Sequence, residues 1–423
     1  MLEPLYARRR DDAEVILQWI QVETGLAELS FVQTHSPKSV QMYLDLLPVA
    51  RRLAKLEPSS LQAIKQEAEI EGDVALALQP TNSRASLDHA KRQIAVLITL
   101  AGRFPQDSDL KQDLAESLAS AAVPLKDLGS YADAAEYFER SIRTLEPLLE
   151  AEPHNVQTQR NLLGAYRDYC ELLGVPWSAN MGRSAEARSY CEKSVAMARE
   201  LSGADPQDQT ARFDLGVNLA ELGMVDSEPN QVAESLKRLE ESLSILDPIV
   251  RANPGSADIV LKVELVRQYL GLRLHRLGRL PEAADSFRQA LAELDTMTHA
   301  RPGQPSGTAV TVGNEDGLAE VYAEQGDGDA ALTYAARALA RAQKYAASHP
   351  GQAPATGLLG AAFFELAWVE RNVGVWERAS ADAEHATSLW RSIGSDHGVL
   401  SVHRQARERA EALVREIAVH WAK

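Results

Sequence analysis

Three acidic residues come closest to a pattern that could carry out chemistry. Glu315 and Asp316 are followed by Glu320, four residues after Asp316, so a helix would place two of these carboxylates on one face. Paired carboxylates can serve as general acid and general base. An exposed acidic helix face explains the same spacing, and this is the interpretation that we adopt.

Other side chains that carry chemistry do not form a known motif. The two cysteines, Cys170 and Cys191, form no C-x-x-C pair, and the nearest histidines, His397 and His403, lie six residues apart. That spacing differs from the i, i+4 spacing that places two metal ligands on one helix face. The sequence contains no G-x-S-x-G, P-loop or H-E-x-x-H. We therefore predict that the chain is not an enzyme and has neither a cofactor nor a metal site.

The cysteines and the N-terminal sequence give information about the cellular compartment in which the protein is found. We expect Cys170 and Cys191 to be small core residues on consecutive helices of one repeat, with a disulfide between them as the alternative. The sequence Met1-Leu-Glu-Pro lacks the basic and then apolar pattern of a signal peptide. The longest apolar stretch, residues 94–102, is too short to span a bilayer. These features predict a cytoplasmic protein without a membrane segment.

The charge balance argues against one class of partner. The chain carries 44 basic and 60 acidic residues, for a formal net charge of −16. A field of this sign repels phosphate backbones, so we predict that the protein does not bind nucleic acid.

Two sets of helix-breaking residues recur along the chain with one period. Seven prolines are separated by 47 to 53 residues: Pro58, Pro105, Pro153, Pro206, Pro254, Pro302 and Pro350. Four glycines each lie 24 residues after one of these prolines: Gly129, Gly278, Gly326 and Gly374. A long period with two breakers in each cycle is typical of a stacked repeat array, in which each unit buries the apolar face of the next.

The segment after Pro254 shows the predicted unit, a pair of antiparallel helices. A first helix should run from Ser256 to Leu277 and end at Gly278, and a second should run from Pro281 to about Ala300. Five repeats have a helix-capping residue two positions after the proline: Ser60, Asp107, Asn155, Asp208 and Ser256. In three units we expect the first helix to end early, before loops over residues 73–85, 175–183 and 224–231.

Several positions of this unit carry a family resemblance. Leu270-Gly271, Leu274, Gly278, Leu280, Ala283, Phe287 and Ala290-Leu291 fall at the spacing of the tetratricopeptide signature. The resemblance implies an all-α fold, a right-handed α-solenoid of helix hairpins with a repeat of about 48 residues instead of the usual 34. We expect an N-terminal helical leader over residues 1–40, the repeat array over 41–395 and a C-terminal capping helix over 396–423.

The resemblance also implies a function. Tetratricopeptide arrays bind proteins or peptides in a groove lined by the first helix of each unit, and we predict a non-catalytic scaffold of this kind. The family's groove positions fall here on Lys126, Gln268, His275, Arg276, Asp316, Glu320, Phe364, Trp368, Arg371 and Asn372. Trp368 has an alternative role, which is to fill the seam between the last repeat and the terminal helix.

The long repeat also resembles the arrays of bacterial receptor-type serine/threonine protein kinases. The catalytic motifs of a kinase are absent from this sequence. An alternative function is therefore a ligand-sensing or protein-sensing regulatory region of such a signalling system, separated from its catalytic domain and associated with a kinase or another signalling protein.

Overall fold

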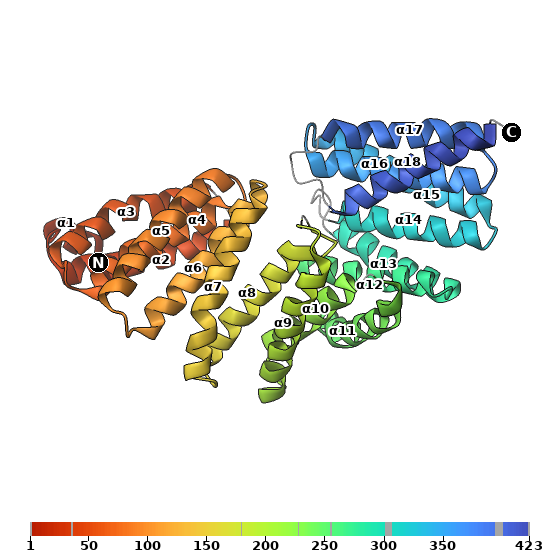
Figure 1. Cartoon of the computed structure of the whole chain (residues 1–423). Helices are drawn as coiled ribbons and strands as arrows, with labels where there is room; N and C mark the ends of the chain where they lie inside the picture. The colour runs from red at the N-terminus through yellow and green to blue at the C-terminus, as the bar shows by residue number, and fades with distance from the viewer. Residues whose placement is uncertain are drawn as a thin grey trace. The chain divides into compact units, whose positions relative to one another are not determined.

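The computed structural model describes residues 2–34, 37–178, 180–226, 228–253, 256–300, 307–393 and 401–421, and the regular elements among them are all helices (Figure 1). This confirms the all-α solenoid. Pro254, Pro302 and His397 lie outside the described residues, as does the predicted boundary at residue 395. The chain forms two compact units, Met1–Tyr169 and Cys170–Lys423.

The first unit contains seven helices and most of an eighth. They are α1 (Leu2–Arg8), α2 (Ala13–Thr34), α3 (Pro37–Leu56), α4 (Leu61–Leu78), α5 (Ser83–Arg103), α6 (Ser108–Asp127), α7 (Tyr131–Ala151) and the start of α8 (Val156–Gly174). Consecutive helices pack against each other from α2 to α7. Ile16, Ile20, Leu46 and Val74 belong to one buried cluster that joins α2, α3 and α4. The predicted N-terminal helices thus share a core with the first hairpin.

The second unit continues the same construction. It holds the end of α8, α9 (Ser184–Ala204), α10 (Gln209–Val225), the 3-10 turn η1 (Pro229–Gln231), α11 (Val232–Ala252), α12 (Ala257–Arg276), α13 (Leu280–Ala300), α14 (Thr308–Glu324), α15 (Gly328–Ser348), α16 (Ala353–Asn372), α17 (Trp376–Ile393) and α18 (Ser401–Trp421). The first helices of successive hairpins also touch, because α14 contacts both α12 and α16, and α16 contacts α18. These contacts create one layer of first helices, on which the candidate site lies.

Most of the predicted capping residues and all four periodic glycines lie at helix ends in the structure. Ser60, Asp107, Asn155 and Asp208 each accept a hydrogen bond from a backbone N–H in the first turn of the following helix, at 2.9–3.3 Å. Ser256 occupies the corresponding position but makes no such bond. The four periodic glycines have positive φ angles of 71–84°, as expected for residues that end helices in the left-handed conformation.

The loop predictions are confirmed only in part. Residues 175–183 do separate α8 from α9, and the loop expected at 224–231 begins at Asp226. The loop expected at 73–85 is wrong, because α4 continues to Leu78 and only residues 79–82 connect it to α5. Val74, Ala75 and Ala77 are buried, and residues 73–79 contain no glycine or proline, so the apolar face extends the helix through this segment.

Cys170 and Cys191 are both buried, as predicted, but they are joined in a disulfide. The expectation of two separate core thiols is therefore wrong, and the alternative of a disulfide holds. The physical reason is the hairpin of α8 and α9, which brings the two Cα atoms to 5.4 Å, within the range of protein disulfides. Sequence separation alone could not show that the two side chains face each other.

Candidate functional site

The predicted groove residues lie on first helices, but not all in one unit. Lys126 is at the end of α6 in the first unit. The other nine are in the second unit: Gln268, His275 and Arg276 on α12, Asp316 and Glu320 on α14, and Phe364, Trp368, Arg371 and Asn372 on α16. Because the three helices of the second unit form one layer, this unit holds the main candidate site.

The exposed acidic helix face expected at Glu315, Asp316 and Glu320 is wrong, because Glu315 is 0% exposed and the Glu320 side chain only 14%. Asp316, Glu320 and Glu365 meet on this layer, and we call them the carboxylate cluster. Glu320 lies between two partners: Oε2 is 3.5 Å from Nδ1 of His275, and Oε1 is 3.4 Å from Nη2 of Arg409 on α18. Nη1 of Arg409 is also 3.9 Å from Oε1 of Glu365. The Arg409 guanidinium lies over the ring of Phe364, 4.7 Å from its centre. One arginine therefore bridges the cluster and an aromatic face.

Burial acts on two of the three carboxylates, Asp316 and Glu365. Burial, followed by the nearby Glu320 and Glu315 carboxylates, raises the pKa of Asp316 well above its usual range. Burial, followed by Glu320, does the same to the pKa of Glu365, although Arg409 opposes the shift. Oδ1 of Asp316 and Oε2 of Glu365 are buried and have no hydrogen-bond partner. Such oxygens favour either a proton or a cation.

The predicted residues on α16 pack against α17 and α18 or bond within their own helix. Phe364 is buried beside Trp390, and Trp368 is half-buried in the same cluster, which includes Leu413 of α18. Arg371 pairs with Glu416 of α18. Asn372 donates a hydrogen bond to the carbonyl oxygen of Trp368 at 2.9 Å. The structure therefore brings His275, Glu320 and Phe364 together around Arg409, and it ties Arg371 to the chain's own helix.

Sequence reasoning missed Glu365 and Arg409, which complete the cluster. Glu365 directly follows the predicted Phe364, and its acidity beside an aromatic groove residue was the available signal. Arg409 lies 89 residues after Glu320, and no spacing rule connects the two. The contact depends on how α18 lies against α16.

The first unit contains an acidic cleft that the sequence did not predict. A cavity of about 360 Å³ is lined by α4, α5 and α6, and a second of about 680 Å³ by α2 and α4. Lys65, Glu69 and Asp73 line both cavities, whereas Lys126 lines neither. Lys65 pairs with Asp113 at 2.6 Å. Burial, followed by Glu69 and Glu28, raises the pKa of Asp73 to about 7.

The raised pKa of Asp73 predicts the sign of a pH effect. An unfolded aspartate titrates near about 3.9, so ionised Asp73 destabilises the fold above about pH 7, and this cost disappears as the pH falls towards 4. Asp73→Asn should therefore raise the free energy of unfolding by about 2 kcal/mol at pH 8 and by much less at pH 5. Urea unfolding at both pH values measures this difference. The exposed Asp88→Asn on α5 is the matched control, and equal effects of the two variants would contradict the prediction.

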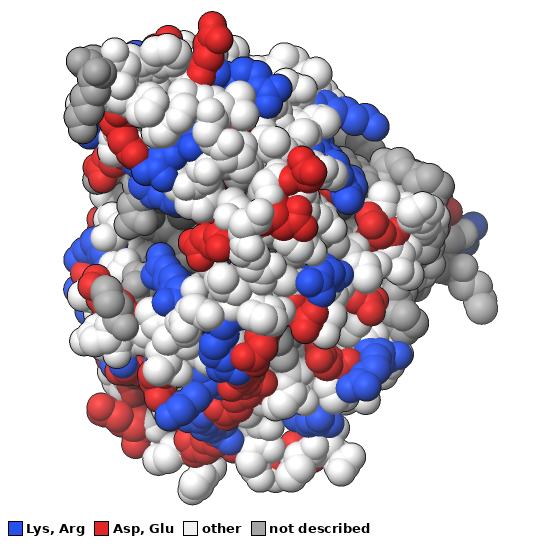
Figure 2. Space-filling model, turned by 90° about the vertical axis from the view of Figure 1, so that its right-hand side faces the viewer, with Lys and Arg blue, Asp and Glu red and all other residues white. Residues whose placement is uncertain are grey.

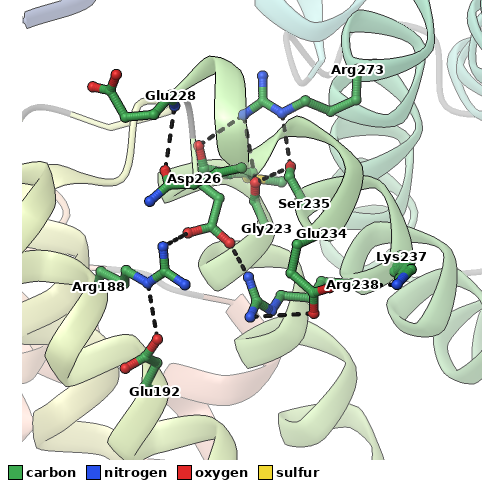
Figure 3. Close-up of polar contacts among 12 residues, drawn as sticks. Arg188, Glu192, Gly223, Asp226, Glu228, Glu234, Ser235, Lys237, Arg238 and Arg273 are labelled. Carbon is green, nitrogen blue, oxygen red and sulfur yellow. Dashed lines mark hydrogen bonds and ion pairs between the residues drawn. The ribbon is translucent and has the colours of Figure 1, made fainter. Parts of the chain in front are cut away.

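A second group of charges in the second unit is internal and joins the hairpins (Figure 3). Asp226 is buried after α10 and pairs with Arg188 of α9 and Arg238 of α11. Burial raises the pKa of Asp226, and the two arginines oppose that shift. Arg273 of α12 reaches back to Oγ of Ser235 at 2.8 Å and to the carbonyl oxygen of Met224 at 3.0 Å. This network fixes one hairpin to the next.

In the part of the chain that the structure describes, no group of three or more His, Cys, Asp or Glu side chains could hold a metal ion. Across the same residues, the helices are too short or too polar to cross a membrane. On the face drawn in Figure 2, acidic and basic side chains are interspersed.

Comparisons with known proteins agree with the repeat architecture. The tetratricopeptide repeat family model matches residues 177–208 and 316–350. The crystal structure of the apo form of RapI is similar over 95% of this chain and 98% of that chain, with a TM-score of 0.52 and 12% identity. A tetratricopeptide repeat protein from Parabacteroides merdae is similar over 82% and 99%, with a TM-score of 0.40 and 15% identity. BtubC from P. vanneervenii is similar over 62% and 91%, with a TM-score of 0.44 and 19% identity. None of the curated proteins matches the sequence.

Proposed function

We propose that this tetratricopeptide repeat protein is a non-catalytic scaffold that binds a protein or peptide on the first helices of its repeats. The observation that carries the proposal is the carboxylate cluster, where α14, α16 and α18 converge on side chains that the fold does not fully pair. Stacking alone does not require buried carboxylates. Charged and aromatic side chains on one layer are instead typical of a surface that recognises a partner.

Seven of the predicted groove residues make up the binding surface that we propose in the second unit. His275, Glu320 and Phe364 form the centre, and Gln268, Arg276, Asp316 and Trp368 extend it along α12, α14 and α16. Lys126 belongs to the first unit and would act there. The division into a leader over 1–40, an array over 41–395 and a cap over 396–423 also stays a proposal.

A charge reversal on the layer tests the function. The tagged chain is used to capture proteins from an extract of its native host, and mass spectrometry identifies what it retains. We expect Glu324→Lys, which changes an exposed residue paired with His275, to lose at least one retained protein. Glu377→Lys, at an exposed position on the second helix α17, is the matched control and should retain it. The same proteins bound to both variants would argue against a role for this layer.

The compartment has its own test. Cytoplasmic location stays a proposal, and disulfides rarely persist in the reducing cytosol. If the chain works there, Cys170 and Cys191 should be found as thiols in cells. Trapping with an alkylating reagent before lysis, followed by mass spectrometry, measures this state directly. Recovery of the disulfide from freshly trapped cells would instead place the chain in an oxidising compartment.

A further inference from the structure

We propose that the carboxylate cluster is a binding site for an arginine side chain of a partner peptide, and that Arg409 occupies this site when no partner is bound. The inference rests on the proposed function and names the chemistry of the partner. It assigns to Arg409 the role of an internal competitor for the site.

The first argument is the guanidinium that already lies there. Arg409 approaches Glu320 at 3.4 Å and Glu365 at 3.9 Å, and it stacks over Phe364 at 4.7 Å. A planar guanidinium suits this combination because it can pair with carboxylates along its edge while its face lies on an aromatic ring. The compact ammonium group of lysine cannot do both equally well.

The second argument is that Arg409 leaves the site incompletely filled. Both contacts with the carboxylates are longer than a charge-assisted hydrogen bond of about 2.8 Å. Oδ1 of Asp316 and Oε2 of Glu365 stay buried without a hydrogen-bond partner. A guanidinium delivered from outside could approach these oxygens more closely than Arg409 does.

The third argument is that Arg409 can leave without unfolding the terminal helix. Its side chain is 55% exposed, whereas α18 is held by the buried residues Ala410, Leu413 and Ile417. The pair between Arg371 and Glu416 ties α18 to α16 independently. A change of side-chain rotamer therefore frees the site while the helix stays in place.

Three short peptides test the proposal on the full chain. The probes are acetylated and amidated Gly-Arg-Gly, Gly-Lys-Gly and Gly-citrulline-Gly, and ligand-observed NMR titration measures their dissociation constants. We expect Arg409→Ala to bind the arginine peptide at least about tenfold more tightly than the unmodified chain, because the competitor is gone. The same variant should bind the lysine peptide more weakly and the neutral citrulline peptide weakest of all.

Two further variants locate the binding. Arg409→Ala combined with Glu365→Gln should lose the gain, because position 365 no longer offers a carboxylate that can pair with the guanidinium. Arg415→Ala, an exposed arginine on the same helix, should bind like the unmodified chain. Circular dichroism checks that every variant is folded.

Some results would overturn the proposal. These are an affinity of Arg409→Ala within twofold of the unmodified chain, equal binding of the lysine peptide, or a gain that survives Glu365→Gln. None of the measurements uses a partner protein, so failure here with loss of a protein by Glu324→Lys would reject the arginine site and leave the scaffold function standing.

Discussion

Replacing Phe287 with alanine is expected to reduce the free energy of unfolding by about 3–5 kcal/mol, the usual cost of removing a fully buried aromatic ring. Phe287 is 0% exposed and lies at the centre of a cluster with Leu274, Leu291 and Leu318. Two glycines make room for its ring. A Cβ atom at position 271 would lie 2.5 Å from Cε1 of Phe287, and one at position 317 would also overlap the ring.

This arrangement explains why the loss should be large. Gly271 is on α12 and Gly317 on α14, so the ring fills the space where two successive hairpins approach. Alanine at position 287 would leave a cavity that a backbone held by neighbouring helices cannot close. Equilibrium unfolding in urea measures the effect. Phe363→Ala, on a half-buried ring of α16, is the control and should cost less. A loss below about 1 kcal/mol for Phe287→Ala would show that the hairpins can shift to fill the space.

The repeat was predictable because its determinants are local. A glycine with positive φ ends α12 at Gly278 wherever the neighbouring hairpins lie, and Asp107 caps α6 through a residue three positions away. The buried stripe of α13, including Ala283, Phe287 and Leu294, follows the period of a helix. Each of these patterns involves only residues that are close in sequence, and together they predict the helix pairs and the all-α fold class.

The candidate site was less predictable because it depends on contacts that are distant in sequence. Family positions identified His275, Glu320 and Phe364, but Arg409 joins them only because α18 packs against α16 and α17. The acidic cleft around Asp73 likewise requires α2, α4 and α6 to be placed together. The resemblance to arrays of receptor-type kinases stays a prediction.

A second large effect is expected from Arg273, a residue that is only 3% exposed. Burial lowers the pKa of Arg273 to about 10, so the side chain still carries its charge at neutral pH. It donates to the carbonyl oxygens of Met224 and Gly223 near the end of α10 and to Oγ of Ser235 on α11. Carbonyl groups at the end of a helix have no partner within the helix, so this arginine supplies the donor that the Met224 carbonyl lacks, whereas the Gly223 carbonyl also accepts from the Ser235 hydroxyl.

Arg273→Met keeps most of the side chain's length and removes these donors. We expect a loss of about 2–4 kcal/mol, because the carbonyl oxygen of Met224 becomes a buried acceptor without a donor. Arg273→Lys should recover little of it, since an ammonium group cannot reach acceptors on two helices in the same geometry. Arg276→Met is the matched control, because it makes the same change at an exposed position one turn further along α12, and it should stay within about 0.5 kcal/mol.

The sign of the change in unfolding free energy for Arg273→Met shows whether the hydrogen bonds of this arginine or the cost of burying its charge is larger. If the hydrogen bonds to α10 and α11 outweigh the cost of burying the charge, urea unfolding will show Arg273→Met to be clearly less stable than Arg276→Met. If burial of the charge dominates, the methionine variant will match or exceed the unmodified chain, as replacement of buried ion pairs by apolar residues sometimes does. We expect the first result, because Arg273 joins α12 to the ends of two helices in the preceding hairpin and no other described side chain donates to the carbonyl oxygen of Met224.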